Sequence, residues 1–120
     1  MLGAANRLKD RADFTTVRER GRRWRGDLLI LNAVQRAPEG PSRFGFVVSR
    51  RIGKAVVRNR VKRRMRAVIR RHIAEMARGY DVVFIARPGA GEASFASLAD
   101  AALDLLRLAR LISDLPEVSQ

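Results

Sequence analysis

The spacing of apolar residues divides the chain into segments of helical and of strand character. Over residues 57–76, apolar side chains recur at intervals of three and four, the pattern of an amphipathic helix. This stripe comprises Val57, Val61, Met65, Val68, Ile69, His72 or Ile73, and Met76. Short apolar runs of strand length cover residues 28–34, 43–49 and 81–87. The periodicity therefore predicts one long helix and three strands.

Two further helices are expected near the ends of the chain. A helical pattern opens at residues 6–8 and turns Leu8, Ala12 and Val17 inward, either as one continuous helix or as a turn followed by a second helix. A helix is expected from about residue 13 to 19, ending near Gly21. The last begins at Ser94, a favourable N-cap residue, and runs to about residue 113. The order α-β-β-α-β-α predicts an α+β fold, a small α/β sandwich around one central sheet. With 120 residues, the chain is expected to be a single domain, residues 1–120.

Two local features refine this picture. The turn at residues 37–41 joins the runs 28–34 and 43–49, which are expected to pair as a hairpin. Asn32 is the only polar residue inside the first of these runs. Because a buried amide needs hydrogen-bond partners, its side chain is expected to face a wet surface rather than the core.

The charge of the chain predicts a binding surface on the long helix. The chain has 25 Lys or Arg against 12 Asp or Glu, a net charge of +13. Residues 50–71 contain 11 basic residues in 22, and residues 41–74 contain no acid. Like charges four residues apart, such as Arg60 and Arg64, repel on a helix. A polyanion partner would relieve this repulsion. Guanidinium groups suit phosphate, so sulfate or phosphate is also expected on this face.

The same composition argues against several other classes of protein. There is no cysteine and only one histidine, His72, which lies on the apolar side of the predicted helix. Neither paired carboxylates near the basic face nor a phosphate-binding glycine loop occurs, so no catalytic or metal-binding residues are expected. The basic helix lacks the Trp- and Leu-rich face of a membrane anchor, and no apolar run reaches membrane-spanning length. A cytoplasmic protein with no membrane partner is expected.

One long run of residues carries a family resemblance. Residues 44–66 read FGFVVSRRIGKAVVRNRVKRRMR, with Arg58-Asn59-Arg60 at the centre. This run is similar to the signature of the bacterial ribonuclease P protein subunit, and further matches lie at residues 6–8, 13–14, 21–22 and 81–87. The resemblance covers nearly the whole chain except the last predicted helix.

The resemblance implies a role in a ribonucleoprotein endonuclease. In that family, a catalytic RNA subunit carries the active site and its Mg²⁺ ions, and removes the 5′ leader from precursor tRNA. The protein is an accessory RNA-binding subunit with no catalytic residues of its own and no bound cofactor. The family fold contains a left-handed β-α-β crossover. By position, the resemblance implies that the following residues contact the RNA subunit: Arg50, Arg51, Lys54, Arg58, Asn59, Arg60, Lys62, Arg63, Arg66 and Arg70.

The resemblance also implies a cleft for the leader between the first helix and the sheet. Phe14 matches an aromatic residue of that cleft, although an aromatic residue on an amphipathic helix is often simply part of the core. Arg7, Arg11 and Arg18 follow at helical spacings and would form a basic stripe beside it. Arg18 and Asn32 stand where many members of the family have aromatic residues, so charge is expected to replace some stacking.

A second hypothesis is a non-catalytic protein, such as a ribosomal protein, that binds structured RNA through a similar fold and a basic helix. Composition alone cannot separate the two hypotheses. The Arg58-Asn59-Arg60 run, together with the upstream Phe44-Gly45 and Ser49, favours ribonuclease P.

Overall fold

The computed structural model describes residues 2–113, which form three α-helices, three short 3-10 helices and four strands. In chain order the elements are η1 (Ala4–Asn6), α1 (Arg11–Arg20), β1 (Arg22–Arg25), β2 (Leu29–Gln35), β3 (Arg43–Val47), η2 (Arg50–Ile52), α2 (Ala55–His72), η3 (Ile73–Glu75), β4 (Tyr80–Ala86) and α3 (Phe95–Leu108). The predicted α+β class is confirmed, with one strand more than expected.

The strands form one mixed sheet in the order β1-β2-β4-β3. β2 is antiparallel to both β1 and β4, whereas β3 runs parallel to β4. The predicted hairpin between residues 28–34 and 43–49 is therefore wrong, because β4 lies between these strands. Its residues Val82, Val83 and Phe84 are all buried, so β4 needs cover on both faces and takes a central position.

The additional strand, β1, has the sequence Arg-Arg-Trp-Arg. A single apolar residue gives no periodicity, so the local sequence predicts no strand here. β1 forms because it pairs with β2 along its whole length, from Arg22 opposite Ala33 to Arg25 opposite Ile30. Pairing with a well-packed neighbour outweighs weak local preference.

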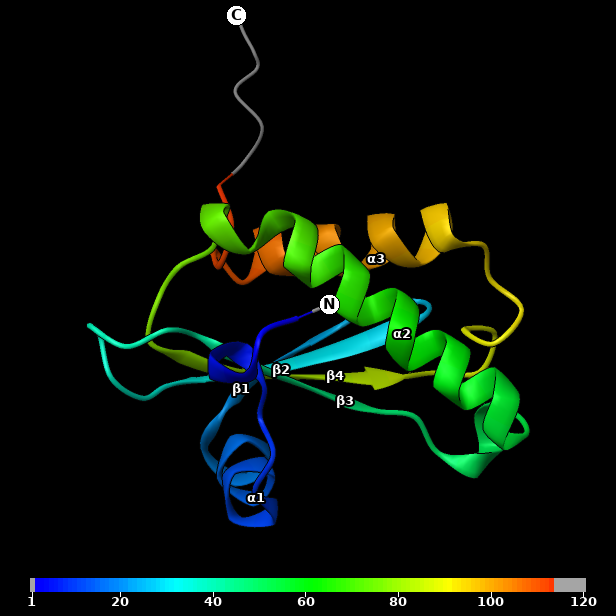
Figure 1. Cartoon of the computed structure of the whole chain (residues 1–120), viewed down its shortest axis with the longest axis horizontal. Helices are drawn as coiled ribbons and strands as arrows, with labels where there is room; N and C mark the ends of the chain where they lie inside the picture. The colour runs from blue at the N-terminus through cyan, green and yellow to red at the C-terminus, as the bar shows by residue number, and fades with distance from the viewer. Residues whose placement is uncertain (1, 114–120) are drawn as a thin grey trace, which may run out of the picture.

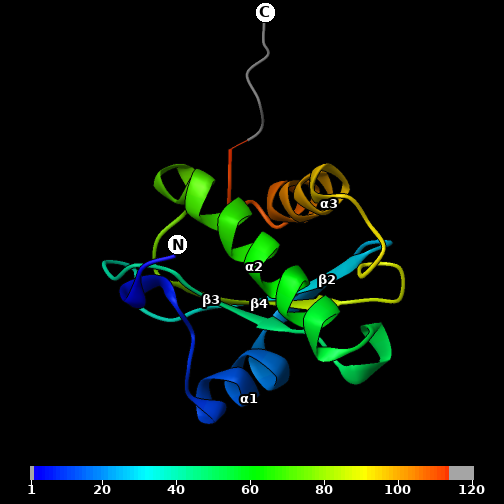
Figure 2. The same ribbon diagram turned by 45° about the vertical axis from the view of Figure 1, so that its right-hand side comes forward.

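α2 connects the parallel neighbours β3 and β4, as a parallel pair requires a crossover. The left-handed sense of this crossover stays the expectation given by the family resemblance. α2 and α3 lie together on one face of the sheet, and α1 lies on the opposite face (Figures 1 and 2).

The main core lies between the sheet and the pair α2 and α3. Leu29, Leu31 and Phe84 of the sheet are almost completely buried there, and Phe46 stacks on Phe84 with 6.2 Å between the ring centroids. The helices contribute the apolar stripes that the sequence predicted: Val61, Met65, Val68 and Ile69 from α2, and Leu98, Ala102, Leu105 and Leu106 from α3. Ser94 caps α3 as expected, its Oγ accepting from the Ser97 amide at 3.0 Å. α3 ends at Leu108, earlier than predicted, and Arg110 follows with a φ of 60°.

A smaller cluster fills the space under α1. Leu8, Val17 and Val83 are buried in it, and Phe14 packs against them. Ala12, predicted to point inward, is exposed. The ring of Phe14 lies directly on Gly45 of β3, where a Cβ atom would overlap the ring. α1 is thus seated on the sheet mainly by Phe14 and Val17.

Candidate nucleic-acid interface

One long side of α2, together with η2, carries basic side chains that the fold does not use. Within residues 2–113, none of these side chains makes a hydrogen bond or an ion pair, in contrast to their neighbours Arg60 and Arg64. We call these side chains, together with the Asn59 amide among them, the outer basic surface: Arg50, Arg51, Lys54, Arg58, Asn59, Lys62, Arg63, Arg66 and Arg70. Because residues 41–74 contain no acid, no residue of α2 carries a negative charge that could neutralise this surface.

The other side of α2 uses its arginines within the protein. The Arg60 Nη2 donates to the carbonyl oxygen of Gly91 at 3.0 Å, and the Arg64 Nη1 donates to that of Ala93 at 3.0 Å. Further along, the Arg71 guanidinium lies 5.8 Å from the centre of the Phe95 ring. The charge pattern assigned this side of the helix to the binding surface as well, but Arg60 and Arg64 are bonded to the protein itself. Arg60 and Arg64 fasten the loop between β4 and α3 to α2.

The two sides could not be distinguished from helical spacing alone. Positions 60, 64 and 71 share one flank of α2, and positions 58, 62 and 66 share the other, at similar distances from the apolar stripe. What separates them is that α3 and the loop before it lie against the first flank only. That neighbour comes from residues 87–95, so its position depends on the tertiary fold.

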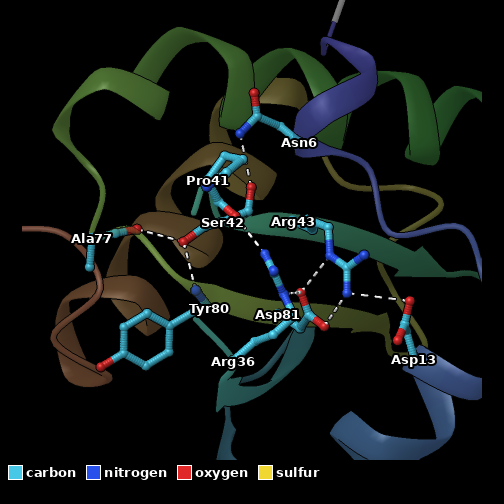
Figure 3. Close-up of polar contacts among 9 residues, drawn as sticks. All are labelled: Asn6, Asp13, Arg36, Pro41, Ser42, Arg43, Ala77, Tyr80 and Asp81. Atoms are coloured by element: carbon cyan, nitrogen blue, oxygen red, sulfur yellow. Dashed lines mark hydrogen bonds and ion pairs between the residues drawn. The ribbon is translucent and has the colours of Figure 1, made fainter. Parts of the chain in front are cut away.

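A buried carboxylate, that of Asp81 in β4, lies at the centre of a cluster of charged side chains (Figure 3). The side chain of Asp81 is only 5% exposed. Its oxygens accept from Arg43 Nε at 2.8 Å and Nη2 at 2.7 Å, and from Arg36 Nε at 3.0 Å. Arg43 also lies 3.3 Å from a carboxylate oxygen of Asp13, which ties β3 to α1.

The charges in this cluster shift two titrations. Burial raises the pKa of Asp81, but the hydrogen bonds from Arg43 and Arg36 lower it by more, so the carboxyl stays ionised below its usual range. The hydrogen bond to Asp81 raises the pKa of Arg43, against the opposing effect of burial. Arg36 and Arg43 are therefore occupied by the fold, and they are not available as phosphate contacts.

Beside this cluster, Ser42 holds three segments together. Its Oγ donates to the Ala77 carbonyl at 2.6 Å and accepts from the Tyr80 amide at 3.0 Å, while its carbonyl accepts from Asn6 Nδ2 at 2.8 Å (Figure 3). The chain after Asn6 then runs beside β3, where the Leu8 amide donates to the Phe44 carbonyl at 2.9 Å. These bonds fix the segment that leads into α1.

The predicted leader-binding residues do not share one helix stripe. Arg11 and Arg18 are exposed on α1. Arg7 precedes the helix and forms an isolated parallel β-bridge with Phe44. Its Nε donates to the Leu2 carbonyl at 3.0 Å. The prediction of a stripe through Arg7 is wrong because η1 and an extended segment come before α1. Phe14 is half-buried, so its ring is both packed and partly accessible.

Asn32 lies on the α1 face of the sheet but is not exposed to solvent. It is 3% exposed, and its Oδ1 accepts from Arg23 Nε at 3.1 Å. The predicted wet position is therefore wrong. The partner that the amide needs comes from β1, the strand that the local sequence does not predict.

An apolar row beside α1 was also missed. The strand pairing sets Val47 opposite Ile85, and Ile85 opposite Ile30, so these three side chains form a row on the α1 face. Val47 is 40% exposed and the two isoleucines are half-buried. We call them the open row. In Figure 1, the sheet extends beyond α1, and no other helix lies on the α1 face there. The apolar character of the three residues could be read from the sequence, but their alignment in one row required the strand register.

Comparison with known proteins places this geometry in a family. The family model for ribonuclease P matches residues 2–110. The chain belongs to that family. The ribonuclease P protein component of Streptomyces avermitilis is 45% identical, over 88% of this chain and 95% of the relative. That of Syntrophomonas wolfei is 34% identical over 94% of each chain.

Solved structures of ribonuclease P proteins have the same fold. The protein from Staphylococcus aureus superimposes with a TM-score of 0.84 at 25% identity, covering 91% of this chain and 99% of that one. The protein from Thermotoga maritima gives a TM-score of 0.77 at 30% identity, covering 85% and 96%.

Membership of the ribonuclease P family decides between the two hypotheses for function. It makes the chain a component of a hydrolytic ribonuclease with an RNA partner, in tRNA processing, and it removes the support for a ribosomal protein. No helix within residues 2–113 has both the length and the apolar character needed to cross a bilayer.

Proposed function

We propose that this chain is the accessory protein subunit of a cytoplasmic ribonuclease P that removes the 5′ leader from precursor tRNA. The outer basic surface docks on the catalytic RNA subunit. The α1 face of the sheet, with Phe14, Arg11 and Arg18, receives the single-stranded leader. The RNA subunit supplies the active site and its Mg²⁺ ions, and the protein supplies no catalytic residue.

The observation that carries the docking part is the division of α2 into two sides. Arg58, Arg63 and Arg66 have no partner among residues 2–113, while Arg60 and Arg64 are bonded to main-chain carbonyls. Unpaired arginines keep all their donors for the bidentate contacts that phosphate accepts. The outer basic surface therefore contacts RNA. Arg60 acts on RNA binding indirectly, by holding the loop between β4 and α3 beside α2.

The leader part is supported by the combination of an accessible aromatic ring, an apolar row and flanking arginines. Bases of a single strand stack on aromatic rings and lie on apolar surface, while basic side chains follow the backbone. Phe14 offers a ring for stacking, and the open row offers apolar surface for the bases. Arg11 and Arg18 offer basic side chains for the backbone. Asn32 is held by Arg23, so it shapes the floor of this surface rather than contacting a base.

Reconstitution tests the assignment of roles. The purified protein alone is expected to have no nuclease activity at any Mg²⁺ concentration. Addition of the cognate RNA subunit should give accurate cleavage of precursor tRNA at physiological Mg²⁺. Leader cleavage by RNA-free protein, or no effect of the protein on the RNA subunit, would refute the proposal.

Phe14 separates leader binding from general RNA binding. Phe14→Leu keeps apolar contact with Gly45 but removes the ring, and should weaken binding of leader-bearing precursor tRNA by about 1–3 kcal/mol. Binding of mature tRNA should not change. Phe95→Leu, at another half-buried phenylalanine on the opposite side of the sheet, is the control and should affect neither substrate. Equal losses for both tRNAs would make Phe14 a core residue only.

A further inference from the structure

A second concentration of arginines lies at the edge of the sheet formed by β1. Residues 18–25 read Arg-Glu-Arg-Gly-Arg-Arg-Trp-Arg, five arginines in eight residues. All five are exposed, and within residues 2–113 none forms an ion pair. Only Arg18 among them was assigned to a site by sequence, and the outer basic surface on α2 does not include any of them.

The strand register connects this edge to the leader surface. Arg25 is opposite Ile30, which is opposite Ile85, which is opposite Val47. The open row therefore ends at Arg25. The neighbouring row, which runs from Gly45 through Val83 and Asn32, ends at Arg23 in the same way. A chain lying along the open row would reach these arginines when it leaves the sheet.

The other face of the same edge is also cationic. Arg22 and Trp24 alternate with Arg23 and Arg25, and the Arg22 guanidinium lies 5.1 Å from the centre of the Trp24 ring. This cation–π contact positions the Arg22 guanidinium over the Trp24 ring. Strand β1 thus presents arginines to both faces.

Protection of an edge strand against aggregation is the simpler explanation of charge at this place. One or two charged residues, most often lysines, suffice for that purpose. Here every position of β1 except Trp24 is arginine, and Arg18 and Arg20 extend the charge onto α1. Such a density raises the repulsion between the arginines, which a bound polyanion would relieve.

We infer that the β1 edge is a second RNA-binding surface, which takes the phosphate backbone of the upstream leader nucleotides. The inference rests on the proposed function, because it extends the path of the leader. α2 packs near β3, and α3 packs near β1. The RNA subunit docks on α2, so the cleavage site lies toward β3 and the upstream nucleotides lie toward β1.

The dimensions of the sheet set the leader length that reaches this edge. Four strands about 4.8 Å apart span roughly 14 Å, so a leader must be several nucleotides long to extend across the sheet from β3 to β1. A leader of about two nucleotides ends before β1, whereas one of about ten nucleotides passes it.

The test uses the reconstituted holoenzyme with precursor tRNAs of these two leader lengths. Arg22→Gln combined with Arg25→Gln should weaken binding of the long-leader substrate several-fold and leave the short-leader substrate unchanged. The slope of log affinity against log salt should fall by about 0.7 for each phosphate that the variant no longer neutralises. Arg78→Gln combined with Arg110→Gln removes the same charge from exposed positions outside β1 and should change neither.

Three results would overturn the inference: no weakening with the long leader, equal weakening at both lengths, or the same weakening in the control pair. In each case, normal cleavage of the short-leader substrate by the wild-type holoenzyme would leave the proposed function standing. Photo-crosslinking of the wild-type holoenzyme gives a measurement that needs no variant. A photoreactive nucleotide upstream in the leader should label residues 18–25, and labelling of other segments alone would refute the path.

Discussion

Arg43 and Arg63 are the same residue type in one small protein, but their surroundings have little in common. Arg43 is 26% exposed and holds both oxygens of the buried Asp81. Arg63 is exposed on α2 and has no partner within residues 2–113. The first is a structural group whose charge is already neutralised. The second keeps its full charge and all its donors for another molecule.

This contrast extends to the whole basic complement of the chain. Arg36, Arg60 and Arg64 belong with Arg43, because each donates to a carboxylate or a carbonyl of the protein. The outer basic surface belongs with Arg63. Net charge therefore overstates the number of groups available to RNA. Partners within the fold, rather than position in a motif, distinguish the arginines that keep their donors free for another molecule.

The largest expected effect comes from an arginine that is bonded within the fold. Arg43→Met leaves the buried Asp81 with Arg36 alone, and should lower the free energy of unfolding by about 3 kcal/mol, near the lower end for breaking a buried ion pair. Arg63→Met, on the exposed side of α2, should change it by less than about 0.5 kcal/mol. Urea denaturation of the two variants measures the difference. Similar stabilities would remove the distinction between the two classes.

The same cluster predicts a dependence of stability on pH. Because the folded-state pKa of Asp81 is lowered, its ionised form contributes stability above the unfolded-state pKa of about 3.9. That contribution is lost as the pH falls through the folded-state pKa. The advantage of wild type over Asp81→Asn should thus be constant between about pH 5 and 7 and shrink in more acidic solution. An advantage that does not change on acidification would contradict the paired arrangement.

The two sides of α2 provide the sharpest form of the comparison. Arg64→Ala removes the hydrogen bond to the Ala93 carbonyl, and should cost about 1–2 kcal/mol of stability. Amide hydrogen exchange should increase in the loop between β4 and α3. Arg63→Ala should preserve stability and exchange, but weaken binding to the RNA subunit by about 1–2 kcal/mol and lower the salt slope by about one.

If Arg63→Ala and Arg64→Ala reduced RNA binding equally without any change in loop exchange, the hydrogen bond to Ala93 would have no functional meaning. Arg60→Ala is expected to follow Arg64→Ala, because its guanidinium bonds to Gly91 in the same loop.

The smallest expected effect concerns anions. Sulfate bound among Arg58, Lys62 and Arg66 should stabilise the folded protein by roughly 1 kcal/mol at about five times its Kd. Thermal unfolding in sulfate and in chloride at equal ionic strength measures this, since screening is common to both salts. Sulfate also acts by general exclusion from protein surfaces. The excess stabilisation by sulfate should therefore shrink in Arg58→Gln combined with Arg66→Gln, and an unchanged excess would leave only the general effect.

Periodicity was sufficient for the elements with a strong apolar pattern. The stripes of α2 and α3 follow from apolar residues at helical intervals, and the strands β2, β3 and β4 follow from short apolar runs. The Ser94 cap follows from the residue type at the start of α3. β1 did not follow, because its strand state comes from pairing with β2.

Long-range contacts account for the other differences. The separation of β2 and β3 by β4, the partner of Asn32 on β1, and the carbonyls opposite Arg60 and Arg64 all involve residues distant in the chain. The motif around Arg58-Asn59-Arg60 identified the family and the basic helix. It could not indicate that its two arginines lie on different flanks, Arg58 without a partner among residues 2–113 and Arg60 bonded to the Gly91 carbonyl.

The position of β4 has a consequence for how the protein is made. β2 and β3 each pair with β4 and not with each other, although β4 follows both of them in the sequence. Until Tyr80–Ala86 emerges, the nascent chain has no central strand, and the apolar side of α2 has little to pack against. Because contacts distant in sequence must close together, the sheet cannot form until β4 has been synthesised, and it then folds as one cooperative step. The most positively charged segment of the chain thus spends its synthesis unfolded, beside a particle made largely of RNA.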